Sequence, residues 1–149
     1  MKLMFIVNSL DFFISHRLDI AIAAQKQKYE VHIFTFSSGD ESKILDKGFQ
    51  YHPIKLKRSK LNLFNDLLIF IKLFKILYLV KPTIVHLVTL KPIIYGGIVS
   101  KLLSINSIVI AFSGLGTIFT KSKKNYFFYR LLIIQILKII FSKKNKLKV

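Results

Sequence analysis

Short apolar runs alternate along this chain with longer stretches in which apolar and polar residues are mixed. Five of the runs are rich in Val, Ile, Leu, Phe and Tyr, which predicts buried strands over residues 3–7, 30–36, 49–54, 83–88 and 105–112. The stretches between them carry apolar residues three and four positions apart or begin at helix-starting residues. They predict helices over residues 12–28, 41–47, 65–80, 92–103 and 125–141, followed by a frayed Lys-rich tail.

Details at the ends of the predicted helices refine this pattern. Asp11 or Ser15 is expected to cap the first helix, and Asn62 or Asn65 to begin the third. The Gly96–Gly97 pair, inside the fourth helix, would let its backbone approach the sheet closely.

The regular alternation of strand and helix predicts the fold class. It is typical of an α/β protein with a Rossmann-like, doubly wound parallel sheet of about five strands and helices on both faces. A strand order of 3-2-1-4-5 would place the ligand crevice at the carboxyl ends of the first and fourth strands. The loops over residues 8–13, 89–92 and 113–116 would then line that crevice.

The charge of the chain is strongly asymmetric. The formal net charge is +17, and all seven carboxylates lie between Asp11 and Asp66, so residues 67–149 hold fourteen Lys/Arg and no Asp or Glu. Such a segment favours anionic partners. With 52% hydrophobic residues and a mean hydropathy of +0.48, an anionic membrane surface fits better than nucleic acid, which we do not expect as a partner. A compositional bias toward Lys, Ile, Asn and Phe is the alternative source of the charge.

Two helices share the character of a membrane-interface segment. The predicted helices over 65–80 and 126–141 combine wide apolar arcs with narrow basic faces. Arg130, Gln135 and Lys138 interrupt the second, so it is expected to be interfacial or buried rather than membrane-spanning. Packing against a second domain is the alternative explanation. No signal peptide is expected at the start of the chain.

Several chemistries are disfavoured by what the sequence lacks. There is no G-x-G-x-x-G after the first strand and no G-x-x-x-x-G-K-[ST] phosphate loop. The absence of Cys excludes disulfides and thiolate metal sites, and four scattered His residues predict no metal site.

Three motifs together resemble one family. They are Phe5-Ile-Val-Asn-Ser-Leu-Asp-Phe-Phe-Ile-Ser-His-Arg-Leu-Asp19, Pro82-Thr-Ile-Val-His-Leu-Val-Thr-Leu-Lys-Pro92 and Ala111-Phe-Ser-Gly-Leu-Gly-Thr-Ile-Phe-Thr120. In this order, on the loops after the first, fourth and fifth strands, they resemble glycosyltransferases of the GT-B fold, family-4 type, that act on lipid-linked saccharides. The resemblance covers residues 1–149, but only as the N-terminal, acceptor-side half of such an enzyme, without the C-terminal donor-binding domain.

The resemblance implies a set of acceptor-binding residues and no assigned catalytic residue. The candidates are Asn8, Ser9, Asp11, Phe12, His16, Arg17, Thr89, Lys91, Ser113, Gly114 and Gly116. Backbone amides of residues 13–16 would hold a phosphate with help from His16 and Arg17, and Lys91 would pair with an acceptor phosphate. Each has a structural alternative: a surface histidine for His16, an ordinary solvated lysine for Lys91, and a plain turn for the two glycines. His86 reads as a core histidine with satisfied hydrogen bonds.

The implied reaction is transfer of a sugar, of hexosyltransferase type, from a nucleotide-sugar to a lipid-linked or polysaccharide acceptor. It would take place at the cytoplasmic face of the membrane, with the protein bound peripherally. No cofactor or metal is expected, and the nucleotide-sugar would bind only with the C-terminal domain. The chain alone is expected to be inactive, so a separate donor-binding domain or subunit is a possible partner. The alternatives are a non-catalytic subunit and a basic membrane-surface binding protein.

Overall fold

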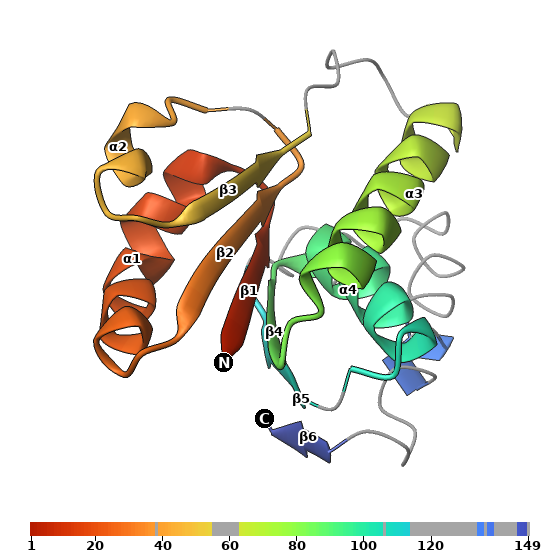
Figure 1. Cartoon of the computed structure of the whole chain (residues 1–149). Coiled ribbons are helices and arrows are strands. Elements are labelled where there is room, and N and C mark those ends of the chain that lie inside the picture. Colours follow the sequence, from red (N-terminus) through yellow and green to blue (C-terminus); the bar gives the residue numbers. More distant parts are fainter. Residues whose placement is uncertain are drawn as a thin grey trace.

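The computed structural model describes residues 1–37, 39–54, 63–105, 107–113, 134–135, 137–138 and 146–148. Figure 1 shows these as one sheet with helices packed against it. The strands are β1 (Lys2–Val7), β2 (Glu30–Thr35), β3 (Gln50–Pro53), β4 (Ile84–Val88), β5 (Ser107–Ala111) and β6 (Lys146–Lys148). The helices are α1 (Leu10–Lys26), α2 (Ser42–Leu45), α3 (Leu63–Val80) and α4 (Leu90–Leu102).

The sheet confirms the predicted fold class. Its strand order is β3-β2-β1-β4-β5-β6, and all neighbouring strands pair in parallel. The first five strands therefore have the predicted 3-2-1-4-5 order. The prediction of a frayed tail is wrong for Lys146–Lys148, which add a sixth strand beside β5.

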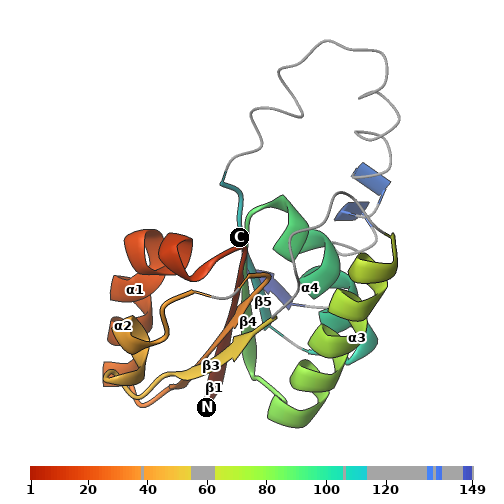
Figure 2. The same ribbon diagram turned by 90° about the horizontal axis from the view of Figure 1, so that it is seen from above.

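The two faces of the sheet are covered by different helices. Figure 2 shows α1 and α2 on one face and α3 and α4 on the other. Under α1 lies a cluster built around Phe5, Phe13 and Ile33, while Met4, Leu73 and Leu87 belong to the cluster under α3 and α4. Adjacent residues of β1 thus point into opposite cores, which explains why the central strands read as continuous apolar runs.

The helix α4 approaches the sheet at Gly96, as the glycine pair predicts. A Cβ atom at this position would lie 2.4 Å from Leu87 Cδ2 and 3.1 Å from Ile6 Cδ1. A side chain here would force Leu87 or Ile6 to move, so glycine lets the helix backbone approach β1 and β4 without disturbing them.

The first helix begins earlier than predicted. It runs over Leu10–Lys26, and its cap is Ser9, whose Oγ accepts a hydrogen bond from the Phe12 amide at 3.3 Å. The prediction of Asp11 or Ser15 as the cap is therefore wrong. Ser15 lies inside the helix, where its hydroxyl donates to the Asp11 carbonyl at 2.9 Å. Most other predicted boundaries differ from the observed ones by one or two residues, with α3 starting at Leu63 and α4 at Leu90.

Candidate functional site

The ends of the central strands meet at one edge of the sheet, the upper edge in Figure 1. Here the Thr89 amide, after β4, donates to the carbonyl of Ala111 at the end of β5, with a distance of 3.2 Å. After β1, the Asn8 carbonyl accepts a hydrogen bond from Ser37 Oγ at 3.3 Å. The structure therefore brings the loops after β1, β2, β4 and β5 together. Ser113 belongs to this edge and is partly buried, whereas Gly114 and Gly116 lie outside the described residues.

The start of α1 does not offer the phosphate site that was predicted over residues 13–16. Because the helix begins at Leu10, the Phe13 amide already donates to the Ser9 carbonyl at 3.1 Å. The Phe12 amide is taken by the Ser9 side chain. Free amides of a helix belong to its first turn, so any available donors are those of Leu10 and Asp11. Asn8 and Asp11 are exposed at this end of the helix.

Two of the candidate side chains on α1 are held by each other. The rings of Phe12 and His16 stack with their centroids 4.4 Å apart and an interplanar angle of 7°. The Nδ1 atom of His16 lies 2.6 Å from Ser15 Oγ. His16 is exposed, in agreement with the prediction of a surface histidine.

Arg17 on α1 and His86 on β4 each carry a buried nitrogen without a partner among the described residues, and the Arg17 charge acts on the pKa of His86. Arg17 donates through Nη1 to the His16 carbonyl at 2.9 Å, yet its Nε is buried and unpartnered within the described residues. His86 packs against Phe5 with ring centroids 5.1 Å apart, and its Nε2 is also buried without a partner there. The prediction of a core histidine with satisfied hydrogen bonds is thus wrong at Nε2. Burial, with a smaller effect of the Arg17 charge, lowers the pKa of His86 to about 4, so the ring is neutral at pH 7.

Thr89 has a strained backbone where α4 begins. Its φ of 71° and ψ of 161° lie in a region that essentially only glycine adopts. The residue is 9% exposed, and its Oγ1 is buried with no partner among the described residues. A β-branched residue in this conformation costs on the order of 1–3 kcal/mol. Such strain often accompanies functional sites. It therefore makes Thr89 a stronger candidate for acceptor binding than its position in the sequence alone does.

Lys91 is not an ordinary solvated lysine. Its Nζ lies 2.9 Å from Asp66 Oδ1 on α3, and it lies 5.9 Å from the ring centroid of Phe36 and 5.6 Å from that of Tyr95. The Tyr95 hydroxyl donates to the same carboxylate. Burial first, and then the Asp66 charge and hydrogen bond, raise the pKa of Tyr95 to about 12. Sequence reasoning missed Phe36 and Asp66, because nothing local in the sequence links them to Lys91. It also missed Tyr95, four residues after Lys91 on α4, because the helix was predicted to begin only at residue 92.

Comparison with known proteins decides the family. The family model described as glycosyl transferase 4-like matches residues 2–149, nearly the whole chain. The chain belongs to the glycosyl transferase 4-like family. No curated protein sequence matches the chain.

Solved structures show the same fold as this glycosyl transferase 4-like chain. MurG of Acinetobacter baumannii is 18% identical with a TM-score of 0.57, over 75% of this chain and 34% of its own. The UDP-GlcNAc 2-epimerase of Methanocaldococcus jannaschii is 19% identical with a TM-score of 0.65, over 100% of this chain and 45% of its own. A putative UDP-N-acetylglucosamine 2-epimerase of Listeria monocytogenes is 12% identical with a TM-score of 0.66, over 95% and 38%. The chain therefore spans less than half the length of these three proteins.

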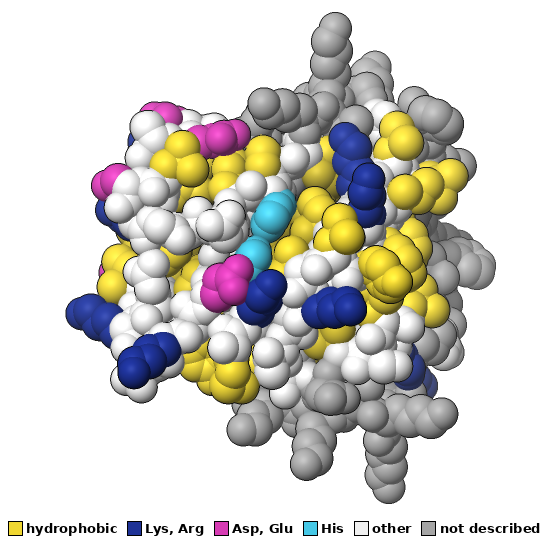
Figure 3. All heavy atoms as spheres, in the orientation of Figure 1, with side chains coloured by type: hydrophobic (Ala, Val, Ile, Leu, Met, Phe, Trp, Pro, Cys, Tyr) yellow, Lys and Arg dark blue, Asp and Glu magenta, His cyan; other side chains and the backbone are white. Residues whose placement is uncertain are grey.

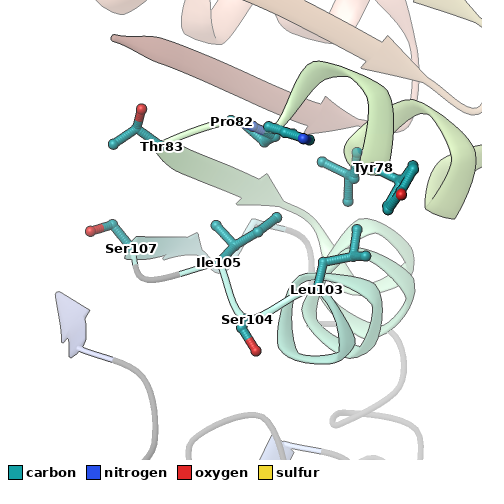
Figure 4. A pocket seen from close by; sticks show the side chains of 9 residues that line it. Tyr78, Pro82, Thr83, Leu103, Ser104, Ile105 and Ser107 are labelled. Carbon is teal, nitrogen blue, oxygen red and sulfur yellow. The ribbon is translucent and has the colours of Figure 1, made fainter.

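A cavity of about 380 Å³ lies at the opposite edge of the glycosyl transferase 4-like domain (Figure 4). It is formed by the end of α3, the entry to β4, and the turn from α4 to β5. Its lining residues are Leu77, Tyr78, Lys81, Pro82, Thr83, Leu103, Ser104, Ile105 and Ser107. These residues precede or begin the strands, whereas ligands of open α/β sheets bind at the carboxyl ends. The cavity is thus separate from the candidate site.

Among the described residues, no group of three or more His, Asp or Glu is arranged to hold a metal ion. None of the helices in that part of the chain is long and apolar enough to cross a membrane.

Proposed function

We propose that this chain is the acceptor-side half of a glycosyltransferase that moves a sugar from a nucleotide-sugar to a lipid-linked or polysaccharide acceptor. The observation that carries the proposal is the edge where the loops after β1, β2, β4 and β5 meet, in a chain of the glycosyl transferase 4-like family. In the proposed reaction the acceptor oxygen bonds to the anomeric carbon of the donor sugar while the bond to the departing nucleotide breaks. Positioning of the acceptor would be the contribution of this half.

The nucleotide-sugar would be held by a second domain or a separate subunit. The chain spans 34% of MurG and 45% of the archaeal epimerase, which supports the proposal that a further half is needed. We expect no transfer by the chain alone, and no resident cofactor or metal in it. A non-catalytic subunit that recruits a donor-binding partner is the closest variant of this proposal.

The test measures transfer and acceptor binding separately. The purified chain is incubated with a panel of nucleotide-sugars and a polyprenyl-pyrophosphate-linked saccharide in detergent micelles. We expect binding of the acceptor and no turnover, because residues 1–149 would supply only the acceptor side of the proposed cleft. Arg17→Met should weaken acceptor binding, while Lys26→Met, an exposed position at the far end of the same helix, should not. Turnover by the chain alone would contradict the proposed need for a second half, and absence of acceptor binding would contradict the acceptor role.

We also propose that the chain docks on the cytoplasmic face of an anionic membrane through α3. The exposed stripe on this helix is Leu67, Ile71, Phe74 and Tyr78, with exposed fractions of 55%, 53%, 38% and 59%. Lys72 and Lys75 are exposed beside it, and Figure 3 shows basic and hydrophobic side chains together on this side of the molecule. An apolar stripe flanked by lysines suits the headgroup region of anionic lipid.

Vesicle co-sedimentation tests this docking. The chain should sediment with vesicles of phosphatidylcholine and phosphatidylglycerol more than with phosphatidylcholine alone. Ile71→Ser should reduce the bound fraction, whereas Ile20→Ser, the same change at a residue of α1 that is 46% exposed, should not. Equal loss in both variants, or tighter binding to nucleic acid in a gel shift, would argue against a membrane role for α3.

A further inference from the structure

Four side chains from three segments meet at the carboxyl edge of the sheet. Phe36 follows β2, Asp66 lies on α3, and Lys91 and Tyr95 lie on α4. Lys91 Nζ is 2.9 Å from Asp66 Oδ1, and the rings of Phe36 and Tyr95 have centroids 6.0 Å apart at an angle of 41°. We call this group the aromatic–lysine cluster.

The cluster is open to solvent on its polar side. The side chains of Lys91 and Asp66 are 45% and 26% exposed, and both aromatic residues are partly exposed. An ion pair at such a surface contributes little to stability, so holding the two helices together does not account for the whole arrangement. The ammonium lies within 6 Å of both ring centroids, where the ring faces attract a cation.

The chemistry of the cluster matches a sugar that carries a phosphate. Aromatic side chains offer broad apolar faces against which the C–H face of a sugar ring packs. The Asp66 carboxylate can accept hydrogen bonds from sugar hydroxyls in addition to those from Lys91 and Tyr95. A lysine ammonium has three N–H donors, and Asp66 occupies one, so a phosphate oxygen can bind the same group.

The cluster is continuous with the edge described above. The Phe36 amide donates to the Val7 carbonyl at 3.4 Å, and the next residue, Ser37, bonds to Asn8. Lys91 is two residues beyond the strained Thr89. The cluster thus extends the candidate site from the ends of β1 and β4 toward α3.

We propose that the aromatic–lysine cluster is the subsite for the phosphate-linked sugar of the acceptor. The sugar ring lies against Phe36 and Tyr95, its hydroxyls bond to Asp66, and its phosphate binds Lys91. This rests on the proposed acceptor role of the chain and adds three residues, Phe36, Asp66 and Tyr95, to the predicted site.

Titrations of the isotope-labelled full chain, followed by NMR, test the subsite. The probes are hexose 1-phosphates, the matching methyl glycosides, and inorganic phosphate. We expect hexose 1-phosphates to shift the signals of Phe36 and Tyr95 and to bind more tightly than either fragment. Lys91→Met should weaken hexose 1-phosphate binding about tenfold and leave methyl glycosides unaffected. Lys72 is an exposed lysine on α3, so Lys72→Met is the matched control. It should change the affinity neither for hexose 1-phosphates nor for methyl glycosides.

A second variant separates the ring contact from the charge. Tyr95→Leu should weaken both hexose 1-phosphates and methyl glycosides, and the dispersion of the NMR spectrum reports whether the variant is folded. Equal affinity of Lys91→Met and the unmodified chain, or no shift at Phe36 and Tyr95 with any hexose 1-phosphate, overturns the subsite. If the polyprenyl-linked acceptor still binds the chain in that case, the proposed acceptor role is retained without this subsite. If that acceptor does not bind either, the subsite and the acceptor role are both rejected.

Discussion

His32 and His52 stack across β2 and β3, with ring centroids 5.4 Å apart and an interplanar angle of 8°. The Nδ1 atom of His32 lies 3.1 Å from Nε2 of His52, and Nε2 of His32 lies 2.9 Å from Glu30 Oε1. Since the carboxylate can only accept, His32 donates to Glu30, and in the neutral pair His52 donates to His32. Lys2 lies beside Glu30 at 3.9 Å. Figure 3 shows histidine, acidic and basic side chains side by side on this face.

This pair predicts a loss of stability in mild acid. Burial is the main cause that lowers the pKa of both imidazoles, while Glu30 partly opposes it at His32. Their folded pKa values lie below the unfolded reference of 6.5, so the unfolded chain binds more protons in acid. The stabilisation is complete above pH 6.5 and is lost as the pH falls below it. Urea unfolding at a series of pH values should show this slope, and His52→Gln, which can still donate to His32, should reduce it. An unchanged slope would rule out the pair as its source.

His86 predicts a second, separate contribution to acid sensitivity. Its pKa is about 4 in the folded chain against 6.5 unfolded, so its stabilisation is complete above pH 6.5 and lost as the pH falls toward 4. The shift corresponds to on the order of 3 kcal/mol. His86→Phe keeps a ring against Phe5 and removes Nε2, which has no partner among the described residues. We expect this variant to lose less free energy of unfolding than the unmodified chain between about pH 7 and pH 5. If the free energy of unfolding fell with pH in parallel for the two proteins, His86 would not be the source of this acid sensitivity.

We predict that relieving the backbone strain at Thr89 stabilises the chain but weakens acceptor binding. Thr89→Gly removes a strained backbone conformation and a buried hydroxyl without a partner in the described part of the chain, so the free energy of unfolding should rise by about 1 kcal/mol. The same change should weaken acceptor binding, because a glycine holds the start of α4 less firmly. Ser104→Gly is the control, since Ser104 also has a positive φ of 54° but lines the cavity at the opposite edge. A Thr89→Gly variant that is more stable and binds equally well would show that the strain has no role in binding.

We predict that a side chain at position 96 clashes mainly with Leu87. Gly96→Ala should lower the free energy of unfolding by roughly 1–3 kcal/mol, because the new Cβ would press on Leu87 and Ile6. Leu87→Ala removes the atom that is nearest to it. A double-mutant cycle should therefore show that Gly96→Ala costs less in the Leu87→Ala background. If the two substitutions had additive effects on the free energy of unfolding, measured by heat or urea, α4 would instead accommodate the new Cβ by moving away from the sheet.

The fold could be predicted because each local signal agreed with the others. The apolar run before Asn8 and the run before Thr89 are β1 and β4, since strands buried on both faces are mostly apolar, with His86 as the exception in β4. The start of α1 was missed because Ser9, Leu10 and Asp11 do not continue the apolar spacing. Only the side-chain bond from Ser9 marks the cap.

The site was harder to predict because its decisive features are tertiary. Lys91 and Asp66 are separated by 25 residues, and no local spacing links them. The positive φ of Thr89 runs against the preference of a β-branched residue, so it could not be inferred from the residue type. His86 and Arg17 lie on different elements, and the burial of their nitrogens, which have no partner within the described residues, follows from tertiary packing.

Pro53 stands in β3, the strand at one rim of the sheet. Because the Ile54 amide donates inward to the Thr35 carbonyl at 3.0 Å, the nitrogen of the preceding residue faces outward. A proline there has no hydrogen to offer to an incoming chain. Amyloid-like stacking of folded copies along this rim is therefore disfavoured.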